Sequence, residues 1–203
     1  MEERARSRPS LEWGTARVEA FSDGVMAVII TIMALELRAP EDATLEALKH
    51  ELPGLVAYIL SFVMIGIYWN NHHHLFRAAD RISGAAMWAN LFLLFWLSLV
   101  PVLTEWLRDE YRYPLPAATY GLVALAAGFA YSILVRTLIR ANGRTSAIAQ
   151  AIGSDVKGYA SLGLYAAGVV LAFVSPWIAY AFYVAVALLW FVPDRRFTRT
   201  SPD

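Results

Sequence analysis

Ionisable side chains interrupt two strongly apolar segments, and they are the residues of this chain best suited to chemistry. The first segment, ARVEAFSDGVMAVIITIMALEL over residues 16–37, carries Arg17, Glu19 and Asp23 near its start. The second ends in IYWNNHHHLFR over residues 67–77, with three consecutive histidines. Ionisable groups at membrane depth are costly unless they are paired or face water, so such residues indicate a function.

Three kinds of chemistry fit these groups. A structural hydrogen-bond network would join polar residues of both segments, because buried polar groups are normally paired: Arg17, Ser22, Asp23, Asn70 and one histidine. A proton relay would make the chain a proton-coupled membrane transporter that uses Asp23 and the His72–His74 cluster, since imidazole titrates near neutrality. A metal site is disfavoured, because neighbouring helical residues point about 100° apart and three consecutive histidines cannot close on one ion.

Catalysis and cofactor binding have no support in the sequence. The chain has no cysteine, which excludes disulfides, thiolate chemistry and cysteine-ligated metals. HExxH, a phosphate-binding glycine loop and the spacing of a Ser/His/Asp triad are all missing. We therefore expect no enzyme, no cofactor and no metal. Lysine and arginine number 17, as do aspartate and glutamate, so net charge does not suggest a nucleic-acid partner.

The composition requires a membrane around these residues, since 58% of the chain is hydrophobic and only 17% is charged. Six apolar stretches are long enough to cross a bilayer as helices: 16–37, 53–76, 82–107, 115–139, 157–175 and 177–193. We predict an all-α, polytopic membrane protein with a single membrane domain, 1–203. Leu45, Leu48 and Leu52 predict a short amphipathic helix at the membrane surface before the second span. Small residues four apart predict close helix packing: Ala124 with Gly128, and Gly163 with Ala167.

The charges of the loops predict the orientation. Arginines gather in the N-terminal tail, in the second and fourth loops and at the C-terminus, whereas the first and third loops are mainly acidic. Because basic loops stay in the cytoplasm, we expect a multi-pass protein of the cell (plasma) membrane with both termini cytoplasmic. The basic start lacks the apolar core of a signal peptide, so we expect the N-terminus to be retained.

The same topology brings the two polar segments to one depth. Asp23 would lie on the order of 10 Å inside the first span, and Trp69, Asn70 and His73 roughly 6–12 Å from the end of the second. Trp69 and His73 are four residues apart, so they share a stripe that can face the first helix. The histidine that meets Asp23 is left open.

Seven residues at the start of the first span, Arg17-Val-Glu-Ala-Phe21-Ser22-Asp23, resemble the RxxxFSD signature of the transmembrane protein 175 family of potassium channels. Every specified position matches. The resemblance extends to Tyr68-Trp69 with His72 and His73, and to Asn90 through Pro101 in the third span. With the pattern of spans it covers most of the chain.

This resemblance implies a homotetramer whose first helices line a central pathway for potassium ions. Bulky apolar side chains narrow that pathway in the family, and counting from the signature aspartate places them at Val28, Ile32 and Leu35. Thr31 matches a threonine beside the constriction. Val28 is smaller than the isoleucine or leucine usual at the first ring. The residues from Arg17 to Asp23, together with Trp69, Asn70 and His73, would form the structural scaffold.

The spacing of the three apolar residues agrees with such a role, since positions four and three apart lie on one face of a helix. An apolar stripe of this kind also faces lipid or a neighbouring helix in many membrane proteins, and only the signature favours the pore. Apolar rings can gate by dewetting, and they contain no fixed dipoles to replace an ion's hydration shell. We therefore expect weaker selectivity than in a carbonyl filter. A membrane scaffold without transport is a further alternative.

Overall fold

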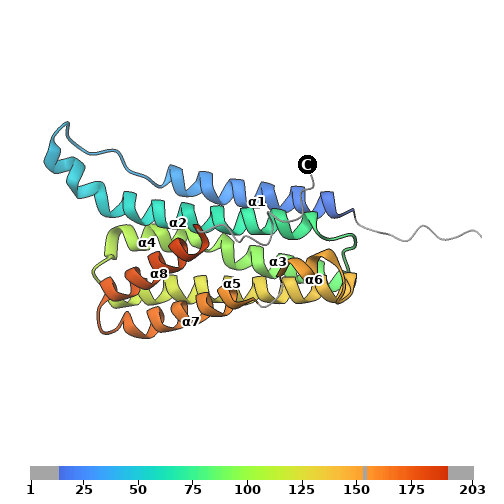
Figure 1. The fold of residues 1–203 in the computed structure, drawn as a ribbon. Helices are drawn as coiled ribbons and strands as arrows, with labels where there is room; N and C mark the ends of the chain where they lie inside the picture. The colour runs from blue at the N-terminus through green and yellow to red at the C-terminus, as the bar shows by residue number, and fades with distance from the viewer. Residues whose placement is uncertain (1–13, 153–154, 192–203) are drawn as a thin grey trace, which may run out of the picture.

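Eight helices and no strand make up the part of the chain that the computed structural model describes, residues 14–152 and 155–191. They are α1 (Thr15–Leu35), α2 (Leu45–Arg77), α3 (Gly84–Ser98), α4 (Val100–Glu110), α5 (Pro114–Asn142), α6 (Ala147–Ile152), α7 (Val156–Leu171) and α8 (Pro176–Phe191). The long helices run side by side in an elongated bundle (Figure 1). The all-α fold predicted from the sequence is confirmed.

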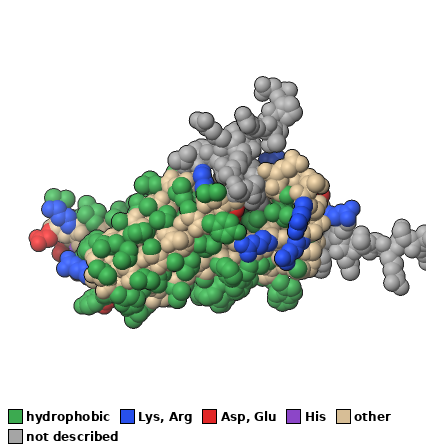
Figure 2. Space-filling view, turned by 60° about the horizontal axis from the view of Figure 1, so that its bottom comes forward, with side chains coloured by type: hydrophobic (Ala, Val, Ile, Leu, Met, Phe, Trp, Pro, Cys, Tyr) green, Lys and Arg blue, Asp and Glu red, His purple; other side chains and the backbone are tan. Residues whose placement is uncertain are grey.

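Helices lie in all six stretches that the sequence predicts as spans. Four segments are long and apolar enough to cross a membrane: α1, α2, the α3–α4 pair and α5. The two others, α7 and α8, have 16 residues each and therefore measure about 24 Å. Hydrophobic side chains cover most of the face shown in Figure 2, and lysine and arginine gather toward its ends. This distribution suits a bundle that crosses a bilayer.

The second span is longer than the sequence suggested. The amphipathic segment expected as a separate surface helix is continuous with it, so that α2 has 33 residues and measures about 50 Å. Thr44 starts the helix, because its hydroxyl accepts a hydrogen bond from the amide of Ala47 at 3.2 Å. Pro53 lies inside the helix and removes one backbone donor without ending it. The first turns of α2 project beyond the end of α1 (Figure 1).

The third span bends at Leu99, which separates α3 from α4. Pro101 has no amide hydrogen, so the carbonyl of Leu97 loses its helical donor at this point. The amide of Leu99 donates to the carbonyl of Trp96, three residues earlier, at 3.3 Å. The bend lets α3 pack against α1 and α5 while α4 packs against α2.

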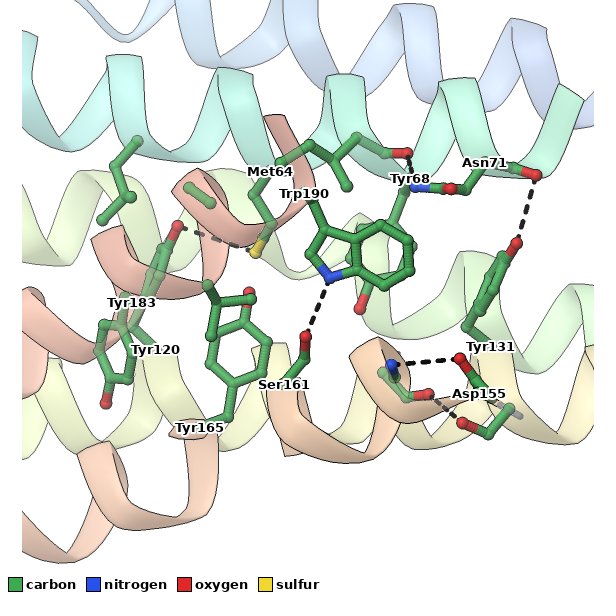
Figure 3. Close-up of a pocket in the computed structure, with 17 residues that line it drawn as sticks. Met64, Tyr68, Asn71, Tyr120, Tyr131, Asp155, Ser161, Tyr165, Tyr183 and Trp190 are labelled. Atoms are coloured by element: carbon green, nitrogen blue, oxygen red, sulfur yellow. Dashed lines mark hydrogen bonds between the residues drawn. The ribbon is translucent and has the colours of Figure 1, made fainter. Parts of the chain in front are cut away.

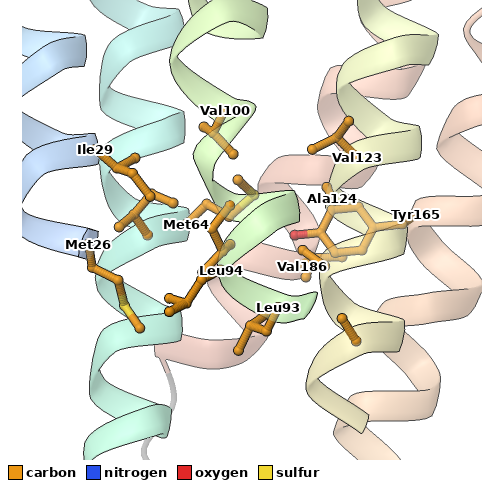
Figure 4. Close-up of a cluster of buried hydrophobic side chains, with 14 of the residues drawn as sticks. Met26, Ile29, Met64, Leu93, Leu94, Val100, Val123, Ala124, Tyr165 and Val186 are labelled. Carbon is orange, nitrogen blue, oxygen red and sulfur yellow. The ribbon is translucent and has the colours of Figure 1, made fainter. Parts of the chain in front are cut away.

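The core lies where α5 meets α3, α4, α7 and α8. Alanine and leucine are its most frequent residues, and Figure 4 shows Met26 and Ile29 of α1 on the same side of the cluster as Met64 of α2 and Leu94 of α3. One whole face of α1 is thereby anchored to the rest of the bundle.

Two glycines let α8 approach its neighbours closely. The buried ring of Tyr183 lies where a Cβ atom on Gly121 of α5 or Gly168 of α7 would collide with it, and its hydroxyl donates to the carbonyl of Ala117 at 3.0 Å. Of the small residues singled out in the sequence, Gly128 packs near Leu162, whereas a Cβ on Gly163 would meet nothing within 4 Å.

Candidate functional site: the two faces of α1

The buried face of α1 consists of Ser22, Met26, Ile29 and Met33, at spacings of four, three and four. Met26 and Met33 are each 1% exposed and Ile29 is 3% exposed. Successive members of such a stripe lie on one side of a helix, which here faces α2, α3 and α4. Packing therefore determines which side of α1 is turned away from the bundle.

The opposite face of α1 is apolar and exposed. It carries the three residues expected at a constriction: Val28 is 55% exposed, Ile32 41% and Leu35 84%. Phe21 and Gly24 are exposed as well and continue this face toward the start of the helix. Thr31 is exposed, and its hydroxyl donates to the carbonyl of Val28 at 2.9 Å. Leaving so much apolar surface in contact with water would be unfavourable, so this face needs lipid or another chain beside it.

A buried chain of hydrogen bonds ties α1 to α2 and α3. Asn90 of α3 is its centre: the side-chain oxygen lies 2.8 Å from Nε2 of His72, and the nitrogen donates to the hydroxyl of Ser22 at 2.8 Å. The Ser22 hydroxyl in turn donates to the carbonyl of Val18 at 2.8 Å. His72 is 0% exposed and Asn90 is 1% exposed. The three helices are therefore held in register by side chains.

A second polar contact lies nearer the start of α1. Nδ1 of His73 is 2.7 Å from a carboxylate oxygen of Glu19, and both side chains are mostly buried. The indole of Trp69 stacks on the imidazole of His73, with ring centres 6.1 Å apart. This contact brings Trp69 and His73 to the first helix, where the sequence expected them.

Asp23 has a different environment from the one anticipated. Its Oδ1 atom is buried and has no hydrogen-bond partner among the described residues. The histidines beside it are engaged elsewhere, because His72 contacts Asn90 and His73 contacts Glu19. Arg17 and Asn70, which were grouped with Asp23, are exposed. Of the predicted set, Ser22 therefore lies in one contact and His73 in the other, and the hydrogen bonds described for these two contacts do not include Asp23.

The sequence did not predict the partners of three residues in these contacts: Glu19, His72 and Asn90. A role for Asn90 in helix contacts can be predicted from the sequence, because it is the only strongly polar side chain between Gly84 and Ser98. A lone amide in such a helix needs partners inside the bundle. The roles of Glu19 and His72 depend on how α1 and α2 are rotated, which the sequence does not specify.

The other end of α1 is held by Arg108 of α4. Its guanidinium donates to the carbonyl of Glu36 at 2.5 Å and to Asp109 at 3.0 Å. The arginine side chain is 8% exposed and passes so close to Gly54 of α2 that a Cβ there would lie 2.6 Å from its Cγ. A cation at the C-terminus of a helix satisfies its last carbonyls and complements its dipole. This contact keeps the end that carries Leu35 next to α2 and α4.

A hydroxyl-lined cavity lies apart from α1, among α2, α5, α7 and α8 (Figure 3). Its volume is about 60 Å³, enough for a few water molecules. Trp190 donates to Ser161 at 2.9 Å, and Tyr131 donates to the carbonyl of Asn71 at 3.2 Å. Residues of α1 do not line it. Among the described residues, no group of three His, Asp or Glu side chains is arranged to hold a metal ion.

Comparison with known proteins agrees with this architecture. The sequence model of the endosomal/lysosomal potassium channel TMEM175 family matches residues 17–101. A protein of Chryseobacterium sp. (strain P1-3) named as a potassium channel is 48% identical over 187 residues, 92% of this chain and 97% of that protein. A chicken (Gallus gallus) protein named as the endosomal/lysosomal proton channel TMEM175 is 34% identical over 42% of this chain and 20% of its own length.

A solved structure extends the agreement to the fold. The crystal structure of a lysosomal potassium-selective channel TMEM175 homolog from Chamaesiphon minutus superposes with a TM-score of 0.75 at 29% identity. The match covers 88% of this chain and 96% of that one. Together with the near full-length similarity to the Chryseobacterium protein, it shows that the chain belongs to the TMEM175 family, whose members are channels and not enzymes.

Proposed function

We propose that this protein is a potassium-permeable cation channel, a homotetramer in which α1 of each subunit lines a central pore. Val28, Ile32 and Leu35 form its hydrophobic constriction, and Thr31 lies beside it. The polar contacts around Ser22 and His73 act as the scaffold that fixes the rotation of α1. The relatives named as potassium channels support the choice of ion.

One observation carries this proposal: α1 has a fully packed face and an exposed apolar face. Only 22% of its apolar stretch is buried in the single chain, against 28% in α2, 44% in α5 and 50% in the α3–α4 span. Because one side of α1 is packed against its own subunit and the other side is exposed, the α1 helices of several subunits can pack around a common axis. Its rings of apolar side chains would then control water and ion entry by dewetting.

Potassium flux into liposomes that contain the purified protein tests the proposal. We expect Leu35→Ser and Val28→Ser to raise the flux, because a hydroxyl in the constriction favours water there. Leu188→Ser and Val170→Ser are matched controls, since these side chains are 60% and 69% exposed on α8 and α7. If the α1 variants conduct like the wild type and the controls, the pore is elsewhere.

The oligomer can be tested separately, because the chain contains no cysteine. Leu35→Cys introduces a single thiol into each subunit. If four copies of α1 surround one axis, mild oxidation links neighbouring subunits, and a mass measurement in detergent gives four chains. Val170→Cys, on the outer face of α7, should not cross-link. Linking of both variants to the same extent would argue against the central position of α1.

Proton passage is the second candidate. The contact between His73 and Glu19 and the buried position of His72 favour it, and the chicken relative is named as a proton channel. In a proton-coupled transporter, Asp23 and the His72–His74 cluster would form the relay. Potassium flux, measured together with the internal pH by a dye inside the liposomes, distinguishes the two candidates. Potassium flux without an imposed proton gradient supports the channel. Potassium flux that requires a proton gradient supports the transporter.

We also propose that the protein resides in the plasma membrane with both termini in the cytoplasm, as the arginine-rich loops indicate. Single cysteines at Arg144, in the connection between α5 and α6, and at Glu41, between α1 and α2, test this in intact cells. A membrane-impermeant maleimide should label position 41 and leave position 144 unlabelled. The reverse pattern would invert the orientation.

A further inference from the structure

An apolar groove of about 390 Å³ opens between α2, α4 and α8, near the end of the bundle where α1 finishes. Aliphatic side chains line it, among them Val56 and Leu60 of α2, Leu107 of α4 and Val184 of α8. Val56 is 63% exposed and Val184 is 43% exposed, so the groove is open at the side of the bundle. In a membrane, that side offers hydrocarbon chains to the groove.

Aromatic side chains form the rim of the groove. Trp177 makes edge contacts with Tyr111 at 5.8 Å and with Tyr180 at 5.9 Å, and the Tyr180 hydroxyl donates to the carbonyl of Tyr111 at 2.7 Å. Tryptophan and tyrosine favour the boundary between hydrocarbon and headgroups, where one side of the ring is apolar and the other is wet. The rim therefore lies at headgroup depth.

Two cationic side chains lie at this rim. Lys49 lines the groove four residues before Pro53, where the predicted span begins, so it lies about 6 Å outside the hydrocarbon and within the headgroup layer. The guanidinium of Arg112 lies 5.3 Å from the ring centre of Tyr111 and donates to the Tyr111 hydroxyl at 3.0 Å. Asp109, an acidic neighbour on α4, is already paired with Arg108 at 3.0 Å.

We propose that this groove binds one anionic phospholipid. An acyl chain lies between α2 and α8, and the phosphate lies at Lys49 and Arg112. The volume falls within the range of about 300–1,000 Å³ that is usual for small-molecule sites. Aliphatic walls, an aromatic rim and two cations match the order of chemical groups along such a lipid. This binding does not depend on which ion the protein conducts.

Native mass spectrometry of the full-length protein, with phosphatidylglycerol or phosphatidylcholine added to the detergent, tests the headgroup part. We expect the wild type to retain phosphatidylglycerol in preference to phosphatidylcholine. Lys49→Gln combined with Arg112→Gln should lower phosphatidylglycerol retention by about fivefold for each cation removed and leave phosphatidylcholine retention unchanged. Both residues are exposed, and Arg144→Gln at the other end of the bundle is the matched control for loss of charge. Equal retention of the two lipids by the wild type, or an Arg144→Gln effect as large as that of the double variant, would overturn the proposal.

The groove itself is tested by filling it. Val56→Trp should reduce the retention of both lipids, whereas Val170→Trp, on the exposed face of α7, should not. Equal retention by these two variants would contradict the site. Val184→Cys tests whether a neighbouring subunit occupies the groove instead of a lipid. If no disulfide forms between subunits, the lipid proposal is supported. Efficient formation of an intersubunit disulfide would overturn the lipid proposal.

Discussion

Replacing Asn90 with leucine should destabilise the protein through the polar groups it leaves behind. Leucine has nearly the shape of asparagine, so a cavity contributes little. The substitution removes both 2.8 Å contacts of the amide, one to His72 and one to Ser22. The buried surroundings offer these groups no water in exchange, because His72 is 0% exposed and Ser22 is 0% exposed.

The two partners lose unequal amounts. Ser22 keeps its hydrogen bond to the carbonyl of Val18, so its loss is small. His72 loses its only described partner, because its Nδ1 atom has none among the described residues. Leaving a buried polar group unpaired costs about 1–3 kcal/mol, and interhelical hydrogen bonds in membranes contribute about 0.6 kcal/mol on average. We expect Asn90→Leu to lower the free energy of unfolding by about 2 kcal/mol.

Equilibrium unfolding in mixed detergent micelles, followed by tryptophan fluorescence, measures this change. Adding His72→Phe should recover more than half of the loss, because the new ring can stack on Phe76 as the imidazole does at 4.2 Å. Ser98→Ala, which removes an exposed hydroxyl bonded to Phe95 on the same helix, is the control and should be nearly neutral. An Asn90→Leu protein within about 0.5 kcal/mol of wild type, or no recovery in the double variant, would refute the reasoning.

Three further substitutions follow from close contacts. Gly121→Ala should lower the free energy of unfolding by about 1–3 kcal/mol, since the new methyl group collides with Tyr183; the same micelle titration measures it, and a neutral result would place that ring elsewhere. Arg108→Gln should change potassium flux in liposomes by freeing the carbonyl of Glu36 at the end of α1, and unchanged flux would show that this contact does not position the proposed constriction. Gly54→Ala should displace the arginine side chain and reproduce the flux of Arg108→Gln; a wild-type flux would contradict the tight approach.

Hydropathy was sufficient to predict the spans, because each must satisfy its backbone within about 30 Å of hydrocarbon. It did not predict that residues 45–52 continue into α2. A proline after an amphipathic segment is usual at a helix boundary, but Pro53 sits inside the helix here. Nothing in the local sequence distinguishes the two situations.

The polar contacts depend on helix rotation, which the sequence does not specify. Spacing along the chain places Asp23, Trp69 and His73 at a common depth, but one residue of helix rotation turns a side chain by about 100°. The choice between Asp23 and Glu19 as the partner of His73 therefore depends on packing across three helices. In the structure, the partner of His73 is Glu19. The exposure of Val28 and Leu35 has the same origin, since it follows from the burial of Met26 and Met33 on the other side.

The bonds of Asn90 also limit how a conduction path could widen. Twisting α1 about its own axis by a single residue position would carry the Ser22 hydroxyl out of reach of the amide 2.8 Å away. A motion that preserves both contacts must move α1, α2 and α3 together. In the proposed tetramer, opening would then be a rigid-body tilt of these helices, together with α5 that packs against α3, relative to the neighbouring subunits.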